Sequence, residues 1–177
     1  MRMLLLSGGV DSAVCLWSGQ FDAALFVDYG QPAAVHERRR SQSLAAGRDV
    51  RWMVATVGSP AHSGILGVFD GSATSAVVPG RNSVFVGLAA MCGGTEITLG
   101  CNADDFAAFA DCRPAVLGSV AEACGATLVL PLAHSSKRQV VAAARALGLP
   151  LAATTSCYRG TDCGVCAACI LLAAALT

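Results

Sequence analysis

The chain has 177 residues, 54% of them hydrophobic and 14% charged, and we expect a single domain over residues 1–177 with a sizeable core. Its formal net charge is zero and its sequence pI is about 6.8, which argues against a nucleic-acid surface and favours a small-molecule substrate. Its terminal apolar stretches are too short for a signal peptide or a membrane span. We therefore expect a cytoplasmic protein, not a membrane protein, whose nine cysteines are thiols or metal ligands.

The first predicted element is a short buried strand ending at Leu6, followed by a loop and a helix over residues 12–20. The loop contains Ser7, Gly8, Gly9, Val10, Asp11 and Ser12. Glycines let the backbone approach a ligand, and the amides at a helix start attract anions. The loop matches neither GxxxxGK[ST] nor GxGxxG, but it resembles the SGGxDS loop of the ATP-pyrophosphatase (PP-loop) superfamily. An ordinary strand-to-helix turn is the alternative.

Four more apolar stretches are predicted strands, at residues 23–27, 50–56, 96–101 and 126–130. Helical segments are expected between them, from residue 32, at 84–91, from about 111, and at 137–147. This alternation predicts an α/β fold with a doubly wound, mostly parallel five-stranded sheet. Residues 57–77 are rich in Gly, Ser and Ala and predict a flexible flap or an irregular insertion.

Polar residues follow several of these strands, at the edge where open α/β sheets bind ligands. Asp28 follows the second strand and either caps the next helix or faces ATP and Mg²⁺. The charged run at residues 36–40 is predicted to face solvent. Arg81 and Asn82 precede the helix at 84–91, with Asn82 as its N-cap in the simpler interpretation. The fourth strand leads to Asn102, Asp104 and Asp105.

Two cations stand near predicted helix starts, where a positive charge is unfavourable unless it meets an anion. Arg113 precedes Pro114, with Asp111 as the candidate N-cap of that helix. Lys137 opens the helix at 137–147 and is the only lysine in the sequence. The expected anion beside Lys137 is an ATP phosphate.

Four cysteines near the C-terminus have the spacing of a metal site: Cys157, Cys163, Cys166 and Cys169. Four thiolates within so short a segment suit a closed, tetrahedral, structural Zn²⁺ site. An iron–sulfur cluster and redox or sulfur-relay cysteines are the two alternatives.

Taken together, the motifs resemble the 7-cyano-7-deazaguanine synthase (QueC) family. They are LLLSGGVDSAVCL, FVDYGQ, VPGRNSVF, GCNADD, DCRP, SSK, SCY and CGVCAAC, in that order. The resemblance implies an adenine nucleotide alpha hydrolase-like (Rossmann-like) fold with a C-terminal zinc knuckle. It also implies an ATP-dependent carbon–nitrogen ligase that converts 7-carboxy-7-deazaguanine and ammonia to the nitrile, with ATP, Mg²⁺ and Zn²⁺, and a homodimer.

The resemblance also suggests roles for individual residues. The ATP set is Leu6, Ser7, Gly8, Gly9, Val10, Asp11, Ser12, Asp28, Arg81, Asn82 and Lys137. The residues suggested to bind the deazapurine are Asn102, Asp104, Asp105, Asp111 and Arg113. A carboxylate among them would pair with the guanine-like N–H edge of the base, and Arg113 would bind the substrate carboxylate. Asp11, Lys137 and Arg113 are the expected catalytic residues.

Ala115, Thr155 and Leu172 depart from the residues usual in the family at those positions. Three other interpretations stay open. One is a relative acting on another deazapurine or carboxylate in a defence or DNA-modification pathway. The others are an enzyme of the tRNA-thiolation type and a nucleotide-binding partner subunit without catalysis.

Overall fold

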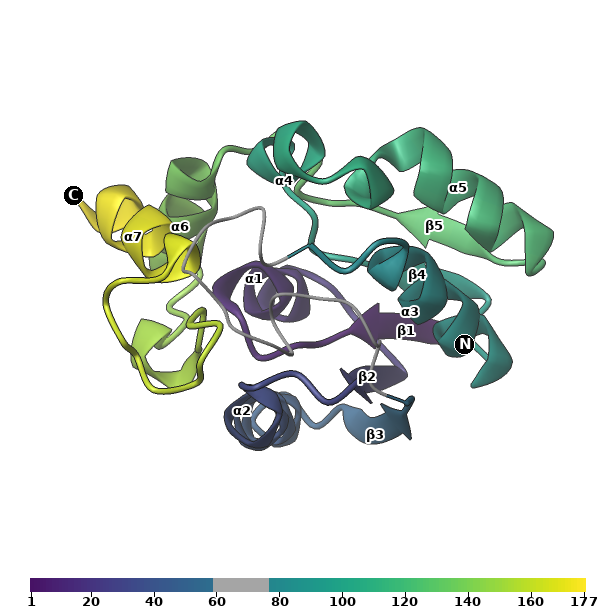
Figure 1. Cartoon of the computed structure of the whole chain (residues 1–177). Helices are drawn as coiled ribbons and strands as arrows, with labels where there is room; N and C mark the ends of the chain where they lie inside the picture. The colour runs from purple at the N-terminus through teal and green to yellow at the C-terminus, as the bar shows by residue number, and fades with distance from the viewer. Residues whose placement is uncertain (59–76) are drawn as a thin grey trace.

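The computed structural model describes residues 1–58 and 77–177, which form a parallel sheet with helices on both faces (Figure 1). The sheet order is β3-β2-β1-β4-β5, and every neighbouring pair is parallel. The strands are β1 (Arg2–Leu5), β2 (Ala23–Asp28), β3 (Arg51–Thr56), β4 (Glu96–Thr98) and β5 (Thr127–Val129). The predicted five-stranded, doubly wound fold is confirmed. Most of the predicted insertion at 57–77 lies outside the described residues.

The two central strands are buried on both faces, which explains why their sequences are continuous apolar runs. Leu4 of β1 pairs with Ala24 of β2 and packs in one core cluster, whereas Met3 pairs with Ala23 and packs in the other. Successive side chains of a strand point to opposite faces. Each of these two strands therefore contributes to two cores.

Helices from different parts of the chain cover the two faces. The first core includes side chains from α1 (Val10–Ser18), α2 (Ala34–Ala46) and α6 (Lys137–Ala146), and the second includes side chains from α3 (Arg81–Met91) and α5 (Pro114–Ala123). The last helix, α7 (Ala167–Leu176), packs against α6. In Figure 1, α6 and α7 lie on the left and α3 and α5 on the right.

A short helix that the sequence analysis did not predict, α4 (Ala103–Ala108), follows β4. Asn102 caps it, accepting the backbone N–H groups of Asp104 and Asp105, while a carboxylate oxygen of Asp105 accepts the Asn102 N–H. This reciprocal arrangement is a capping box. Two short 3-10 helices, η2 (Ala110–Cys112) and η3 (Leu151–Ala153), complete the described elements.

Neither of the two candidate N-caps, Asp111 and Asn82, occupies the N-cap position considered for it. Arg113 is the N-cap of α5, and Asp111 lies in the preceding η2. The Asp111 carboxylate instead accepts the backbone N–H of Asn82 at 3.1 Å, so it caps α3. The N-cap residue of α3 is Gly80, and Asn82 lies inside the helix. Tertiary contact between η2 and α3 thus decides which helix start Asp111 stabilises.

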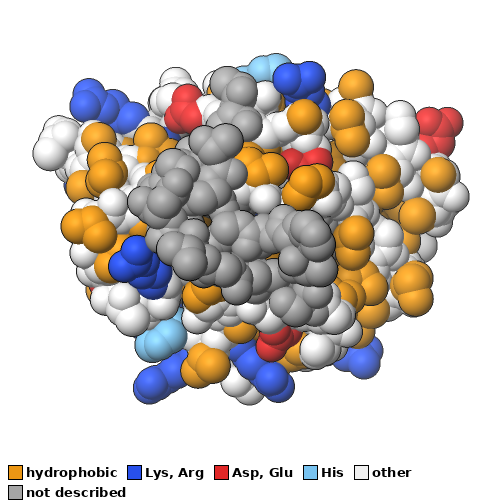
Figure 2. Space-filling view, in the orientation of Figure 1, with side chains coloured by type: hydrophobic (Ala, Val, Ile, Leu, Met, Phe, Trp, Pro, Cys, Tyr) orange, Lys and Arg blue, Asp and Glu red, His pale blue; other side chains and the backbone are white. Residues whose placement is uncertain are grey.

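The surface carries exposed apolar side chains on several helices. Figure 2 shows hydrophobic side chains over α7 on the left of the view and over α3 and α5 on the right. Exposed apolar residues of these three helices include Val84, Met91, Val116, Ile170 and Leu171. The homodimer stays a prediction. Within residues 1–58 and 77–177, no helix combines the length and the apolar character needed to cross a membrane.

Candidate active site

A cavity of about 330 Å³ opens at the carboxyl ends of β1, β2 and β4. Strands β2 and β3 follow β1 on one side of it, and β4 and β5, later in the chain, lie on the other side. The order of the strands therefore reverses at β1, which is the switch point where open α/β sheets bind ligands. Of the predicted site residues, ten line the cavity: Leu6, Ser7, Gly9, Asp11, Ser12, Arg81, Asn82, Asp104, Asp105 and Lys137.

The loop between β1 and α1 is held in one conformation by its own hydroxyl groups. Ser7 Oγ accepts the Gly9 N–H at 3.2 Å, and Ser12 Oγ donates to the Gly9 carbonyl at 3.0 Å. The two serine oxygens are 3.3 Å apart. Both hydroxyls and the first amides of α1 are therefore gathered at one end of the cavity, as a phosphate site requires.

Gly8 has a left-handed backbone conformation, with φ of +87°. A Cβ there would lie 3.0 Å from both the Glu37 carbonyl oxygen and the Arg40 Cβ, because α2 packs directly against the loop. The Gly8 carbonyl accepts the Thr155 N–H at 2.9 Å. The loop is thus fixed between α2 and the segment that leads to the four cysteines.

A chain of polar contacts joins the loop to the starts of α4 and α6. Lys137 Nζ lies 2.5 Å from one carboxylate oxygen of Asp11, and Asn102 Nδ2 donates to the other at 3.0 Å. The Lys137 backbone N–H donates to Asp104 at 2.8 Å. The Asp104 carboxylate therefore lies at the start of α6, where the sequence analysis had identified only the positive charge of Lys137.

Two more carboxyl groups, from Glu37 and Asp105, line the cavity without an ion pair in the part of the chain that the structure describes. Burial raises the pKa of Glu37, and the hydrogen bond from Gln31 Nε2 at 2.7 Å partly opposes that shift. Burial likewise raises the pKa of Asp105, opposed by the Asn102 N–H. Both groups hold a proton more readily than an exposed carboxyl does.

Arg81, the first residue of α3, lines the cavity among aromatic rings. Its Nη1 donates to the Tyr29 hydroxyl at 3.4 Å, and its guanidinium carbon lies 5.9 Å from the Phe85 ring centre. The Tyr29 and Phe85 ring centres are 5.5 Å apart. Arg81 Nε is buried and has no hydrogen-bond partner within residues 1–58 and 77–177.

Six of the residues predicted to bind ATP or the substrate do not line the cavity: Gly8, Val10, Asp28, Asn102, Asp111 and Arg113. Val10 is fully buried in the core, and Asn102 contacts the site through its hydrogen bonds with Asp11, Asp104 and Asp105. The Asp28 carboxylate accepts the Gly30 N–H at 3.1 Å in a turn. Arg113 is exposed at the start of α5. The substrate roles of Asp111 and Arg113 stay predictions without support from the cavity.

Several wall residues were not among the predicted site residues, including Tyr29, Gln31, Glu37, Cys112 and Tyr158. Tyr29 and Gln31 follow β2 within FVDYGQ, so their position after a strand was a usable signal. Glu37 had no such signal, because it belongs to the charged run that was predicted to face solvent. That prediction is wrong for Glu37, which the packing of α2 against the loop turns inward.

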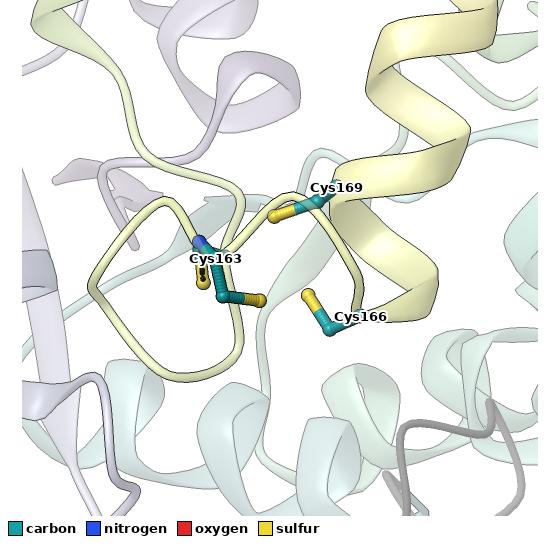
Figure 3. Close-up of side chains that lie close together, drawn as sticks. Cys163, Cys166 and Cys169 are labelled. Carbon is teal, nitrogen blue, oxygen red and sulfur yellow. Dashed lines mark hydrogen bonds between the residues drawn. The ribbon is translucent and has the colours of Figure 1, made fainter.

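The four C-terminal cysteines form one cluster, with all four Sγ atoms within 4.8 Å of one another. Figure 3 shows the sulfur atoms of Cys163, Cys166 and Cys169 turned toward a common centre. Although burial opposes the shift, hydrogen bonds from backbone N–H groups, led by that of Cys163, lower the pKa of Cys157 to about 6. A tetrahedral metal ion bound by four thiolates fits this donor set.

Comparisons with known proteins identify the family of this chain. A family model described as "Queuosine biosynthesis protein QueC" matches residues 2–177. A 7-cyano-7-deazaguanine synthase from Synechococcus sp. (strain RCC307) is 35% identical over 204 residues, covering 97% of this chain and 92% of the relative. One from Thiobacillus denitrificans is 35% identical over 211 residues, covering 96% and 90%.

A solved structure has a similar fold, the U34-tRNA thiolase NcsA from Methanococcus maripaludis with its 4Fe-4S cluster. It matches with a TM-score of 0.56 and 14% identity, covering 99% of this chain and 70% of the thiolase. At this identity the likeness concerns the fold alone.

Proposed function

This chain belongs to the QueC family of queuosine biosynthesis proteins, and we propose that it converts 7-carboxy-7-deazaguanine and ammonia to 7-cyano-7-deazaguanine at the expense of ATP. The observation that carries the proposal is the cavity at the switch point of the sheet. One end of it is built from the loop hydroxyls and the Asp11–Lys137 pair, and the other from aromatic rings and Arg81. A triphosphate suits the first end and a planar acid suits the second.

The chemistry requires activation because a carboxylate repels nucleophiles and has no good leaving group. In the proposed first step, a carboxylate oxygen attacks the α-phosphorus of ATP and pyrophosphate leaves. Ammonia then attacks the acyl carbon, loses a proton and displaces AMP, which gives the primary amide. Lys137 lies at the loop and stabilises the negative charge that develops on the phosphate oxygens.

A nitrile needs a second activation, since the amide must lose its oxygen. The amide oxygen attacks the α-phosphorus of a second ATP, and pyrophosphate leaves again. Loss of both N–H protons and departure of AMP with that oxygen then form the carbon–nitrogen triple bond. The same loop serves both activation steps. In each step the α-phosphorus of ATP must lie beside an oxygen of the group on the deazapurine ring, first the carboxylate and then the amide.

Two metals fit the residues present. Asp11 is the loop carboxylate that lines the cavity, so it would hold Mg²⁺ together with phosphate oxygens, the hard ligands that this ion prefers. Mg²⁺ supplies charge neutralisation for the triphosphate. The four cysteines would hold a structural Zn²⁺. Its binding free energy would stabilise the C-terminal segment, whose Thr155 N–H donates to the Gly8 carbonyl.

The test is direct incubation of the purified, metal-replete protein with ATP, Mg²⁺, ammonia and 7-carboxy-7-deazaguanine, followed by mass analysis of the base and of the nucleotides. We expect the nitrile, with the amide as a transient species and AMP as the nucleotide product. Release of ADP instead would show that the substrate is activated by phosphorylation and not by adenylation. Unchanged acid in a folded, nucleotide-binding sample would contradict the proposal.

One observation favours a second candidate, an enzyme of the sulfur-transfer type. The thiols of Cys101 and Cys112 both line the cavity, and Asn82 Nδ2 donates to Cys112 Sγ at 3.1 Å. The hydrogen bond with Cys112, followed by burial, raises the pKa of Cys101 well above its ordinary value. A thiol held neutral in this way is a poor nucleophile, so Cys101 is poorly suited to start sulfur transfer. The family match makes the nitrile-forming ligase the preferred function.

A further inference from the structure

Arg81 carries a charge that forms no ion pair in the described part of the protein. Among residues 1–58 and 77–177 the ion pair lies between Lys137 and Asp11, and Arg81 forms none. Its hydrogen bond goes to a neutral hydroxyl, that of Tyr29, at 3.4 Å, and its Nε is buried with no partner among those residues. Glu37, Asp105 and Asp111 interact with this guanidinium only electrostatically, without a close contact.

Such an arrangement is unfavourable unless an anion arrives with a ligand. A buried donor without a partner loses the hydrogen bond that it would make to water, and a cation loses more than a neutral group does. The Nε–H and an adjacent Nη–H of a guanidinium form a planar fork that matches the two oxygens of a carboxylate. Arg81 lines the cavity, where a bound ligand can supply such an anion.

The surroundings of Arg81 favour a carboxylate on a planar ring over a phosphate. The phosphate end of the cavity already has its own cation, Lys137, on α6. Arg81 instead lies on α3 beside Tyr29 and Phe85, and Tyr158 lines the same cavity. Aromatic side chains supply faces against which a flat heterocycle stacks.

We propose that Arg81 binds the reacting carboxylate of the planar heteroaromatic acid, the role that the sequence suggested for Arg113. Arg113 is exposed and is not part of the cavity wall. The inference rests on the proposed function and adds the residue that selects the acid. Because the amide intermediate is uncharged, Arg81 contributes strongly to binding of the acid and only weakly to binding of the amide.

The test compares equilibrium binding of three ligands, the acid, the amide and ATP, to the wild type and to Arg81→Met and Arg81→Lys. We expect Arg81→Met to weaken acid binding about 10- to 100-fold, the range for a lost charge-assisted hydrogen-bond pair. Amide and ATP binding should change less than about threefold. Arg81→Lys keeps the charge but loses the fork, so its acid affinity should be intermediate. The matched control is Arg39→Met at an exposed position of α2.

The outcomes separate this inference from the proposed function. Unimpaired ATP binding shows that a variant is folded. If the wild type converts the acid while Arg81→Met binds acid as tightly as the wild type, the inference fails and the function stands. An ATP affinity that falls as much as the acid affinity, or falls alone, would assign Arg81 to a phosphate and overturn the inference. Failure of the wild type to bind the acid would overturn both.

Discussion

Lys137 Nζ lies 2.5 Å from a carboxylate oxygen of Asp11, although 126 positions separate the two residues in the chain. The pair joins the start of α6 to the first turn of α1, beside the loop that would receive the phosphates. Asn102 holds the second oxygen of the same carboxylate. The loop's only acidic side chain is therefore fixed from two sides.

Breaking this pair should damage both stability and turnover. The side chains of Lys137 and Asp11 are only 10% and 21% exposed, so Asp11→Asn should lower the free energy of unfolding by about 1–3 kcal/mol and kcat by at least about 100-fold. Lys137→Met should behave similarly, and the double variant should cost less than the sum. Steady-state kinetics and denaturant unfolding measure both effects. The exposed neighbour Arg138→Met is the control, and an equal loss there would reject a specific role for the pair.

Gly8 should not tolerate a side chain. Its φ of +87° and the 3.0 Å separation between the Glu37 carbonyl oxygen and the position that a Cβ would take predict that Gly8→Ala costs about 1–3 kcal/mol of unfolding free energy and weakens ATP binding. Gly47→Ala is the matched control, since a Cβ at Gly47 meets atoms only at 3.5 Å and beyond. Equal stability of the two variants by denaturant unfolding would contradict the strained-loop explanation.

Removal of the metal should loosen the C-terminal segment. We expect elemental analysis to find zinc bound by the cluster of Cys157, Cys163, Cys166 and Cys169, and a strong chelator to lower Tm because metal binding contributes to folding. Cys163→Ser should reproduce the loss of metal, whereas Cys124→Ser, at an exposed position outside the cluster, should not. Iron and sulfide in place of zinc, after anaerobic purification, would assign an iron–sulfur cluster instead.

The cavity thiols distinguish the ligase from a sulfur-transfer enzyme. Cys101→Ser and Cys112→Ser should each retain nitrile formation within about tenfold, because the ligase mechanism passes no atom through sulfur and such substitutions cost modest stability. A sulfur relay through either thiol would lose its activity entirely. Product formation from the acid, measured for both variants, decides between the two chemistries.

Glu37 makes stability depend on pH with a defined sign. Because burial raises its pKa above the ordinary value of 4.5, the folded chain binds this proton more tightly than the unfolded chain does. The free energy of unfolding therefore falls as pH rises from 4.5 through the raised pKa. Glu37→Gln keeps the shape without the charge, so it should be more stable than the wild type above that range and equal to it below.

Denaturant unfolding across pH checks this difference, with the exposed Glu122→Gln of α5 as control. A Glu37→Gln variant that is less stable than the wild type at high pH would show that the ionised carboxylate stabilises the fold through a partner.

The sequence by itself determined the local features. Apolar runs and glycines identified the five strands, the loop after β1 and the helix that ends at Gly19, because local periodicity and backbone preference decide such elements. The cysteine spacing identified the C-terminal cluster, since four ligands so close in the chain can meet without help from the rest of the fold. Helix α4 was missed, although Asn102 and Asp105 carried its capping signal.

Only the tertiary structure decided which side chains meet. The sheet order places β1 between β2 and β4, and this brings Asp11, Lys137 and Asn102 together from three distant segments. Tertiary packing also places Glu37 and Arg81 in the cavity wall and leaves Arg113 outside the cavity. The physical reason is that side-chain chemistry near a strand end or helix start is encoded locally, whereas its direction depends on how helices and strands pack against one another.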